Sequence, residues 1–405
     1  MTALVVAVFA LVYAGMAAGR VPGLSLDRAG VALIGAIVLY AAGAIGAEAA
    51  VAAIDGRTLL VLFGLMVVSA QASGSGFYDW CAWRIAASRV GSTRLMVTTV
   101  LVAGALSAVF ANDVVVYAMT PMLCRAIVAR GLDARPFLIA LAAGANAGSA
   151  ATVIGNPQNI LIAQHGDLDF LAFLAVCGPP ALIGLVAAAL TIRVVWARAL
   201  AHTPDPVPTA APAVDRAGAL KAGVATVALL VAFAAGLPQV TSVLVIAGAL
   251  LISRRRPTRA MLGDVDWPLL VLFAALFVVT AAFTATGLPA RFLTGLEGAG
   301  IDPTGHGALA AITLAGSNTV GNVPLVVLLL AAMPTVDAAF LHALAVLSTL
   351  AGNLLLTGSI ANIIVAERAA SVGQRFGFVD HALAGVPMTL LAFAVALGWF
   401  ALVLP

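Results

Sequence analysis

The sequence predicts an all-α, polytopic membrane protein built from two inverted repeats. The chain has 405 residues, of which 63% are hydrophobic and only 9% are charged, whereas soluble domains carry about 25% charged residues. Its apolar stretches are many, and most are long enough to cross a hydrocarbon core of ~30 Å, which takes roughly 20 helical residues. The similarity of the two halves, described below, predicts the repeat.

Ten apolar segments are expected to cross the membrane completely, five in each half. The stretch at residues 202–216 is rich in Pro and Ala and is the predicted linker between an N-terminal repeat (1–201) and a C-terminal repeat (217–405). The predicted crossings are residues 2–19, 29–47, 58–75, 136–164, 170–192, 217–236, 239–253, 267–287, 338–365 and 383–404.

Two further apolar stretches are each interrupted by polar residues. Residues 95–129 contain "ANDV" in their middle, and residues 304–333 contain "GSNTVGN". Irregular backbone at membrane depth is tolerated only where it is buried in protein or lines a watery cavity. Each stretch is therefore predicted to be a re-entrant hairpin, the first entering from the cytoplasm and the second from outside.

Two of the ten crossings contain helix breakers and amides. Residues 136–164 include "GNPQN" at 155–159, and residues 338–365 include "GNLLLTGSIAN" at 352–362. Glycine and proline free backbone carbonyls, and amides beside them can line a polar site. Both crossings are predicted to be broken helices.

Three matches between the halves occur in the same order. "LLVLFGLMVV" at 59–68 returns 210 residues later as "LLVLFAALFVV", and "GNPQNILIAQ" at 155–164 returns 203 residues later as "GSIANIIVAE". Between them, "FANDVV" is matched with "GSNTVG" at an offset of 206, which pairs Asn112 with Asn318. Five crossings is an odd number, so the second repeat is inverted, an arrangement that places a binding site near the midplane between broken helices.

The basic residues predict the orientation. With both termini outside, 18 of the 20 Lys and Arg residues fall on the cytoplasmic side, and only Arg57 and Arg291 fall outside. The positive-inside rule expects this bias. We therefore predict a bacterial inner membrane protein with periplasmic termini and a cytoplasmic linker.

Asp113 is an acid in the middle of an apolar hairpin. Ionisable residues at this depth are costly and are functional candidates by default. The alternative is that Asp113 caps the second arm of the hairpin by accepting bonds from free helix N–H groups, with Thr319 as its uncharged counterpart.

The chain resembles the ion transporter superfamily, which includes arsenite permeases, sodium/proton antiporters, citrate carriers and divalent-anion/sodium symporters. The resemblance rests on "AND" at 111–113, "IGNPQN" at 154–159, "SNT" at 317–319 and "TGSIAN" at 357–362. It implies an elevator-type transporter, in which a scaffold from each half holds a mobile domain made of the two hairpins and the two broken helices. An acid beside the first-hairpin Asn resembles the arsenite-permease and antiporter arm.

Together the tips and breaks supply the candidate site. The resemblance implies that "SNT" motifs bind sodium and substrate carboxylates. The candidate substrate-binding residues are Asn112, Asp113, Asn156, Gln158, Asn159, Ser317, Asn318, Thr319, Thr357, Ser359 and Asn362, and the candidate cation-coupling residues are Asp113, Asn112, Gly155, Asn318, Asn353 and Gly358.

Three functions remain open from the sequence. The first is secondary active transport of a small anion, coupled to a sodium or proton gradient. The second is an efflux permease for a neutral metalloid hydroxide such as arsenite or antimonite, exchanging protons. An intramembrane enzyme is the third, but only Asp113 is well placed for chemistry at depth.

The expected partners are few. They are the cargo and the lipid bilayer, with no nucleic acid and no cofactor, and a sodium ion is the one metal that the mechanism admits. Cys81, Cys124 and Cys177 have no metal-ligand or disulfide spacing. A homodimer, where one forms, is expected through the scaffold helices.

Overall fold

The structure, a computed structural model, describes residues 1–18, 23–203 and 210–404. Within these ranges it contains 20 α-helices, two short 3₁₀ helices and no strand, so the predicted all-α class is confirmed. Part of the predicted linker, Arg20 and the end of the first apolar segment lie outside the described residues. Five helices are long and apolar enough to cross a membrane, namely α4 (Gly56–Gly74), α10 (Phe170–Val195), α11 (Arg216–Ala234), α14 (Trp267–Thr284) and α20 (Phe378–Val403).

The other helices are shorter, and some of them share one interrupted apolar stretch. They are α1 (Thr2–Ala18), α2 (Arg28–Ala41), α3 (Ala47–Ala53), α5 (Phe77–Ala86), α6 (Ser92–Ser107), α7 (Asn112–Val128), α8 (Arg135–Ser149), α9 (Pro157–Gly166), α12 (Gln239–Leu251), α13 (Thr258–Gly263), α15 (Leu288–Gly298), α16 (His306–Thr319), α17 (Asn322–Ala332), α18 (Ala338–Ala351) and α19 (Ile360–Ala370), with the 3₁₀ turns η1 (Ala199–Ala201) and η2 (Leu356–Gly358).

Among the described residues, six helices begin at an aspartate that caps them. The carboxylate accepts a hydrogen bond from an N–H of the first turn, a donor that has no partner within the helix. Negative charge is also favoured at this end of the helix dipole. Six of the chain's 17 acidic residues are therefore used to start helices: Asp27, Asp55, Asp169, Asp215, Asp266 and Asp337.

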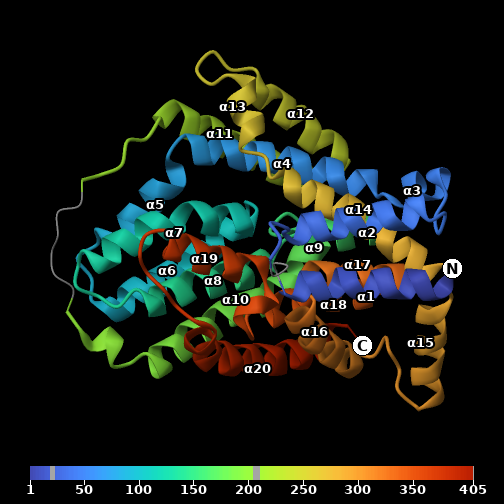
Figure 1. The fold of residues 1–405 in the computed structure, drawn as a ribbon. Helices are drawn as coiled ribbons and strands as arrows, with labels where there is room; N and C mark the ends of the chain where they lie inside the picture. The colour runs from blue at the N-terminus through green and yellow to red at the C-terminus, as the bar shows by residue number, and fades with distance from the viewer. Residues whose placement is uncertain (19–22, 204–209, 405) are drawn as a thin grey trace.

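The helices form two groups by their contacts, and in Figure 1 α4, α11 and α12 of the first group lie above α8, α10 and α20 of the second. In the first, which we call the α14 group (α1, α2, α4, α11, α12 and α14), α2 packs on α1 and α14, and α4 packs on α11 and α12. In the second, the α8 group (α6 to α10 and α16 to α20), α6, α10 and α19 pack on α8, and α16 packs on α18. The groups meet where α9 and α17 contact α4 and α14.

Close backbone packing of α6 on α8 fixes the end of α6 beside the end of α8. A Cβ at Gly144 would lie 2.6 Å from the carbonyl oxygen of Val100, and one at Gly148 would overlap the backbone of Gly104. Small residues allow helix backbones in a membrane to approach this closely. The segment after α6 is thereby held against the segment after α8.

The sequence did not predict four of the helices, α3, α5, α13 and α15. Helix α5 is typical of them, because it carries Asp79 and Arg84 and does not resemble a membrane span. It nevertheless buries Tyr78 and Ile85 on one face and packs on α7. A short amphipathic helix of this kind depends on a neighbouring surface, which the sequence does not reveal.

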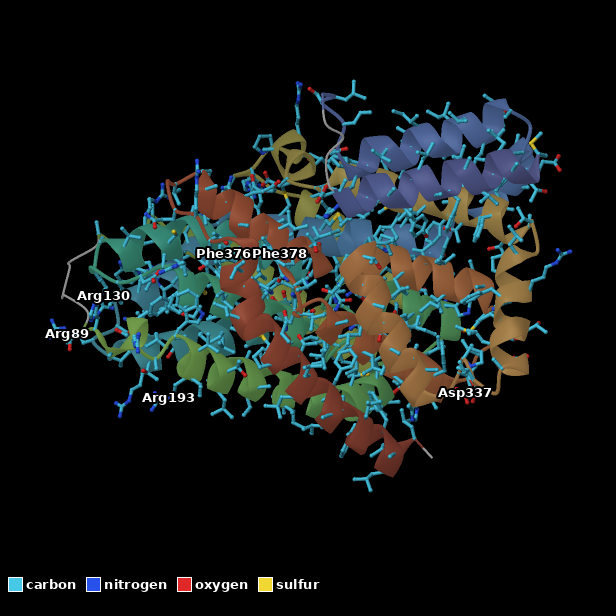
Figure 2. The ribbon with its side chains drawn as sticks, turned by 60° about the horizontal axis from the view of Figure 1, so that its bottom comes forward. Arg89, Arg130, Arg193, Asp337, Phe376 and Phe378 are labelled. Atoms are coloured by element: carbon cyan, nitrogen blue, oxygen red, sulfur yellow. The ribbon has the colours of Figure 1, made fainter. Side chains whose placement is uncertain are left out.

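Three arginines lie at the end of the molecule opposite to the start of α18. In Figure 2, Arg89, Arg130 and Arg193 lie at one end, and Asp337 lies at the other.

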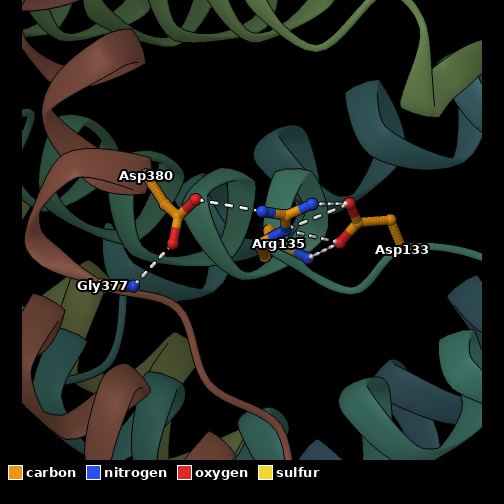
Figure 3. Close-up of polar contacts among 4 residues, drawn as sticks. All are labelled: Asp133, Arg135, Gly377 and Asp380. Atoms are coloured by element: carbon orange, nitrogen blue, oxygen red, sulfur yellow. Dashed lines mark hydrogen bonds and ion pairs between the residues drawn. The ribbon is translucent and has the colours of Figure 1, made fainter.

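One arginine joins the starts of α8 and α20 (Figure 3). Arg135 Nη2 lies 2.7 Å from Asp133 Oδ2, and Arg135 Nη1 lies 3.1 Å from Asp380 Oδ1. Asp380 Oδ2 also accepts a hydrogen bond of 2.8 Å from the backbone N–H of Gly377. Partial burial of the Asp133 carboxyl opposes its ionisation, but the hydrogen bonds from Arg135 outweigh this effect and lower the pKa of Asp133.

We expect Arg135→Gln to lower the free energy of unfolding by about 1 kcal/mol or less at neutral pH, because these ion pairs are partly exposed. Since the pKa of Asp133 is lowered in the folded state, its contribution is present above the ordinary pKa of ~3.9 and is lost as the pH falls through the lowered value. Melting in detergent at pH 7 and at pH 3 measures this. Equal destabilisation at both pH values would contradict the ion-pair account, and Arg255→Gln, whose side chain is 71% exposed, is the control for an exposed pair.

Candidate functional site

The first helix break follows α8 and ends at α9. The side chain of Asn159 turns back to the freed backbone, and its Nδ2 donates to the carbonyl oxygens of Ser149 and Thr152 at 3.1 and 2.9 Å. Asn156 caps α9 by accepting a 2.8 Å bond from the N–H of Asn159. Pro157 occupies the first helical position, where its missing N–H costs nothing. The amides of "GNPQN" thus satisfy the backbone that the break exposes.

The tip of the α6–α7 hairpin contacts this break. The backbone N–H of Asn112 donates to the carbonyl of Gly155 at 3.0 Å, and Thr152 Oγ1 donates to the carbonyl of Ala108 at 2.6 Å. A Cβ at Gly155 would overlap the carbonyl of Ser149. Glycine is therefore required where the tip and the break come together.

The second helix break follows α18, contains η2 and ends at α19. Asn362 Nδ2 donates to the carbonyl oxygens of Gly352 and Leu355 at 2.7 and 3.1 Å. Ser359 caps α19 by accepting a 3.3 Å bond from the N–H of Ala361. Each of these three acceptors lies 203 residues after its counterpart in the first break.

The tip of the α16–α17 hairpin contacts the second break. Asn318 Nδ2 donates to the carbonyl of Ala351 at 3.0 Å, and its Oδ1 accepts from the N–H of Leu355 at 3.1 Å. A Cβ at Gly358 would overlap Asn318 Oδ1. Each hairpin tip is therefore bound to the break within its own half.

The pairing of Asn112 with Asn318 is wrong. Asn112 is the first residue of α7, the second arm of its hairpin, whereas Asn318 lies in the last turn of α16, the first arm. Asn322, the first residue of α17, is the counterpart of Asn112: each Oδ1 accepts from the next N–H, at 2.9 and 3.0 Å. Their offset is 210 residues, the same as that of the "LLVLF" stretches. A single shared Asn could not distinguish two alignments that differ by one helical turn.

Asp113 does not cap α7. The N-cap position is Ala111, and no side chain caps it. The carboxylate of Asp113 is half-buried and forms no hydrogen bond or ion pair with any described residue. Thr319 does not cap α17 either, because its hydroxyl donates to the carbonyl of Ala315 within its own helix. Asp113 therefore remains available for a ligand.

The other predicted site residues divide by exposure. The buried side chains form hydrogen bonds within the protein. Gln158 Nε2 donates to Thr349 Oγ1 at 3.2 Å and Ser317 Oγ donates to the Ser348 carbonyl at 3.4 Å. Asn353 Nδ2 donates to the Ala143 carbonyl at 3.3 Å. In contrast, Thr319 and Thr357 are exposed.

Two residues that the sequence did not single out form the centre of the polar network. They are Asn146 on α8 and Thr349 on α18, and both are 0% exposed. An Asn among small residues, as in "GANAG" at 144–148, is a signal for a buried interhelical hydrogen bond. Nothing local marks Thr349.

A cavity lies at each end of α14. One, of about 580 Å³, lies near its start and is lined by Asp27, Asp266, Thr357 and Glu367 together with residues of α19. The other, of about 520 Å³, lies near its end and is lined by Thr280 and Thr284 together with residues of α9 and α17. Both cavities therefore lie where the α14 group meets the α8 group.

Residues 8–341 match the family described as citrate transporter. The chain belongs to the citrate transporter family. The match runs from α1 into α18, so it covers both hairpins and the first break, while the second break, α19 and α20 lie beyond it. Membership makes the chain a transporter and not an enzyme, as the sequence predicted.

Similar proteins agree with this assignment to the citrate transporter family. The silicon efflux transporter LSI3 of Oryza sativa subsp. japonica is 30% identical over 93% of this chain and 93% of its own length. The inner membrane protein YbiR of Escherichia coli (strain K12) is 30% identical over 85% of this chain and 87% of its own length. A transporter designated arsB in Dictyostelium discoideum is 24% identical over 92% and 87%.

A solved structure shares the fold of this citrate transporter family member. The crystal structure of the Alcanivorax borkumensis YdaH transporter aligns with a TM-score of 0.53 at 15% identity, covering 99% of this chain and 97% of the other. The resemblance to the ion transporter superfamily, predicted from four short motifs, is thereby confirmed.

Proposed function

We propose that this chain is a secondary active transporter in which the α8 group moves, elevator-like, against the α14 group. The observation that carries the proposal is the pair of cavities at the two ends of α14, each next to helices that adjoin the breaks. A rigid group that slides along α14 would expose the same breaks first at one cavity and then at the other. In this scheme the α14 group is the static scaffold and the surface through which a homodimer would form.

The two halves, residues 1–201 and 217–405, are proposed to be inverted repeats joined by the linker at 202–216. The matching contacts of Asn159 and Asn362, which bond carbonyls at equivalent positions, support this proposal. The α6–α7 and α16–α17 pairs are proposed to be the re-entrant hairpins, because each returns at a tip packed against a helix break. Broken helices at the repeat interface are the usual location of transporter sites.

The end that carries Arg89, Arg130 and Arg193 is proposed to be cytoplasmic, and the end that carries Asp337 periplasmic (Figure 2). In a variant without Cys81, Cys124 and Cys177, we expect an impermeant maleimide to label Glu297→Cys in intact cells, because α15 lies outside in this layout. Ala211→Cys, in the linker, should be labelled only after lysis. Labelling of Ala211→Cys in intact cells would refute the proposed orientation, in which the chain lies in a bacterial inner membrane with a cytoplasmic linker and periplasmic termini.

The cargo is proposed to be a small hydroxy compound of a metalloid, neutral or singly charged. Among the described residues, the cavity near the start of α14 is lined by three acids, Asp27, Asp266 and Glu367, and one base, Arg28, a balance that disfavours a dianion or trianion. Relatives named for silicon efflux and as arsB point the same way. A small monovalent anion is the second candidate, and a multiply charged carboxylate such as citrate is disfavoured.

Within the site, Asp113, Thr319 and Thr357 are proposed to meet the cargo or its coupling cation. Thr319 and Thr357 are exposed, and the half-buried Asp113 carboxylate has no hydrogen bond to any described residue. The carbonyls of Gly155 and Gly358 lie where a hairpin tip meets a break. With nearby amides, they are proposed to complete a sodium or proton-coupling site. The remaining predicted residues are proposed to hold this geometry: the buried side chains of Asn112, Asn156, Gln158, Asn159, Ser317, Asn353, Ser359 and Asn362, and the partly buried Asn318.

Transport into proteoliposomes tests the function. The panel is arsenite, antimonite, silicic acid, monovalent phosphate and citrate, each with an imposed sodium or proton gradient. We expect a metalloid hydroxide to move against its own gradient and citrate not to move, and an ionophore should abolish the effect. Accumulation of citrate would contradict the cargo proposal, and flux that ignores both gradients would contradict secondary transport.

A further inference from the structure

Asn146 joins the two halves of the chain. Its Nδ2 donates to Oδ1 of Asn353 and of Asn362, both at 2.9 Å. Its Oδ1 accepts from Ser359 Oγ at 3.0 Å and from Asn112 Nδ2 at 3.3 Å. A side-chain amide has two donors and two acceptor lone pairs, so all four are used. Three of the four partners belong to the second break or the first turn of α19, although Asn146 lies on the helix that leads to the first break.

Thr349 makes the reciprocal set of contacts. Its Oγ1 accepts from Asn156 Nδ2 and from Gln158 Nε2, both at 3.2 Å, and donates to Asn159 Oδ1 at 3.5 Å. A hydroxyl has one donor and two lone pairs, so it too is saturated. All three partners belong to the first break or the first turn of α9, although Thr349 lies on α18.

Asn146 and Thr349 occupy equivalent positions. They are 203 residues apart, the offset that also relates Asn159 to Asn362. Each broken helix therefore uses one buried polar residue of its first segment to hold the break of the other helix. Each break is held to its own helix by a different residue, Asn159 or Asn362.

We propose that Asn146 and Thr349 are crossed positioning residues, which hold the two helix breaks in one fixed relative geometry and do not themselves contact the cargo. The proposal deepens the proposed function and rests on it for its link to transport. Because both side chains are saturated and 0% exposed, neither has an atom left for a ligand. What they set is the placement of the carbonyls and amides that the two breaks offer together to a coupling cation.

Two isosteric substitutions remove these contacts. Asn146→Asp keeps the shape but replaces two donors by acceptors. To donate to the new carboxylate, Asn353 would have to give up its bond to the Ala143 carbonyl, and Asn362 its bonds to the carbonyls of Gly352 and Leu355. Thr349→Val keeps the shape and removes the hydroxyl that bonds Gln158 Nε2 and Asn159 Oδ1, two buried polar atoms. Leaving buried polar groups unsatisfied costs more than the bond itself contributes.

Hydrogen–deuterium exchange of the full-length protein in lipid nanodiscs tests the crossed arrangement without any cargo. We expect Asn146→Asp to accelerate exchange by about fivefold or more in residues 352–362 and to leave residues 150–159 near the parent rate. Thr349→Val should do the opposite. Acceleration confined to each variant's own break, or equal in both, would overturn the inference.

Matched controls separate this effect from general loosening. Thr99→Val removes a buried hydroxyl that bonds only its own helix, through the carbonyl of Leu95, and should leave both breaks unchanged. If Asn146→Asp fails to fold, Asn146→Ser, which keeps one donor at shorter reach, should give the same crossed pattern at smaller amplitude.

Transport kinetics provide the functional readout. In proteoliposomes we expect Asn146→Asp and Thr349→Val to raise the half-saturating concentration of the coupling cation by about tenfold, with the KM for cargo little changed. Loss of maximal rate alone, with the cation dependence intact, would show a merely structural role. If each substitution accelerates exchange in its own break, while the parent chain transports the cargo, this inference is refuted and the proposed function stands.

Discussion

We expect the Asp113→Asn variant to fold and reach the membrane but to lose gradient-driven transport. The substitution keeps the size of the side chain and removes its charge at the start of α7, where the carboxylate forms no hydrogen bond or ion pair with any described residue. An uncompensated acid at this depth is costly unless a proton or cation accompanies it, and the proposed transporter uses that requirement for coupling. The variant loses the charged contact between Asp113 and the coupling cation, so we expect uptake to fall by about tenfold to a hundredfold.

The measurement is concentrative uptake in proteoliposomes at several pH values and sodium concentrations, together with exchange of cargo in the absence of a gradient, which should survive. Asp79→Asn is the matched control, because Asp79 is also a half-buried acid in the first turn of a helix, α5. Undiminished concentration of cargo by Asp113→Asn would assign the coupling cation to carbonyls and amides at the two breaks instead.

Cross-linking α9 to α12 should stop transport completely. Gln164 Nε2 on α9 lies 2.7 Å from Gln239 Oε1 at the start of α12, so this contact joins the proposed moving group to the proposed scaffold. In the elevator scheme it must break in every cycle. With Cys81, Cys124 and Cys177 replaced, a short thiol-to-thiol reagent should arrest Gln164→Cys/Gln239→Cys, and reductive cleavage of the link should restore transport.

The control pair lies within the α14 group. Asp215 caps α11, and its Oδ1 lies 3.2 Å from Arg255 Nη1 in the segment after α12. Linking Asp215→Cys to Arg255→Cys should leave transport intact, because the two residues belong to the same static body. Full activity of the linked Gln164–Gln239 pair would rule out relative motion of α9 and α12.

Local chemistry was sufficient for much of the prediction. Composition and segment length determined the all-α membrane class, and four short motifs identified the superfamily. The positions at which the chain leaves the helix also follow from nearby residues. Gly155 allows the close contact of break and tip, Pro157 starts α9, and Asn159 satisfies the carbonyls that the break exposes. All of these interactions span ten residues or fewer, or require only the absence of a side chain.

The sequence did not determine which residues of the two hairpins correspond. The pairing of Asn112 with Asn318 matched identical residues, but the structure relates Asn112 to Asn322, one helical turn further on. In an apolar helix most positions look alike, so a slip of four residues preserves the pattern of the segment. Asn112 and Asn322 take their places at the start of the second arm only when the two arms of each hairpin pack.

By itself, then, the sequence determined that this chain is a helical membrane transporter with polar interruptions at four places. The tertiary structure alone decided which interruption touches which. Asn146 and Thr349 meet their partners in the other half across 190 to 216 residues of chain, and the acids around the start of α14 come together from α2, α14 and α19. A single sequence encodes helices through neighbouring residues. Contacts of this range depend on how the completed helices pack, and the periodicity of the apolar residues does not determine that packing.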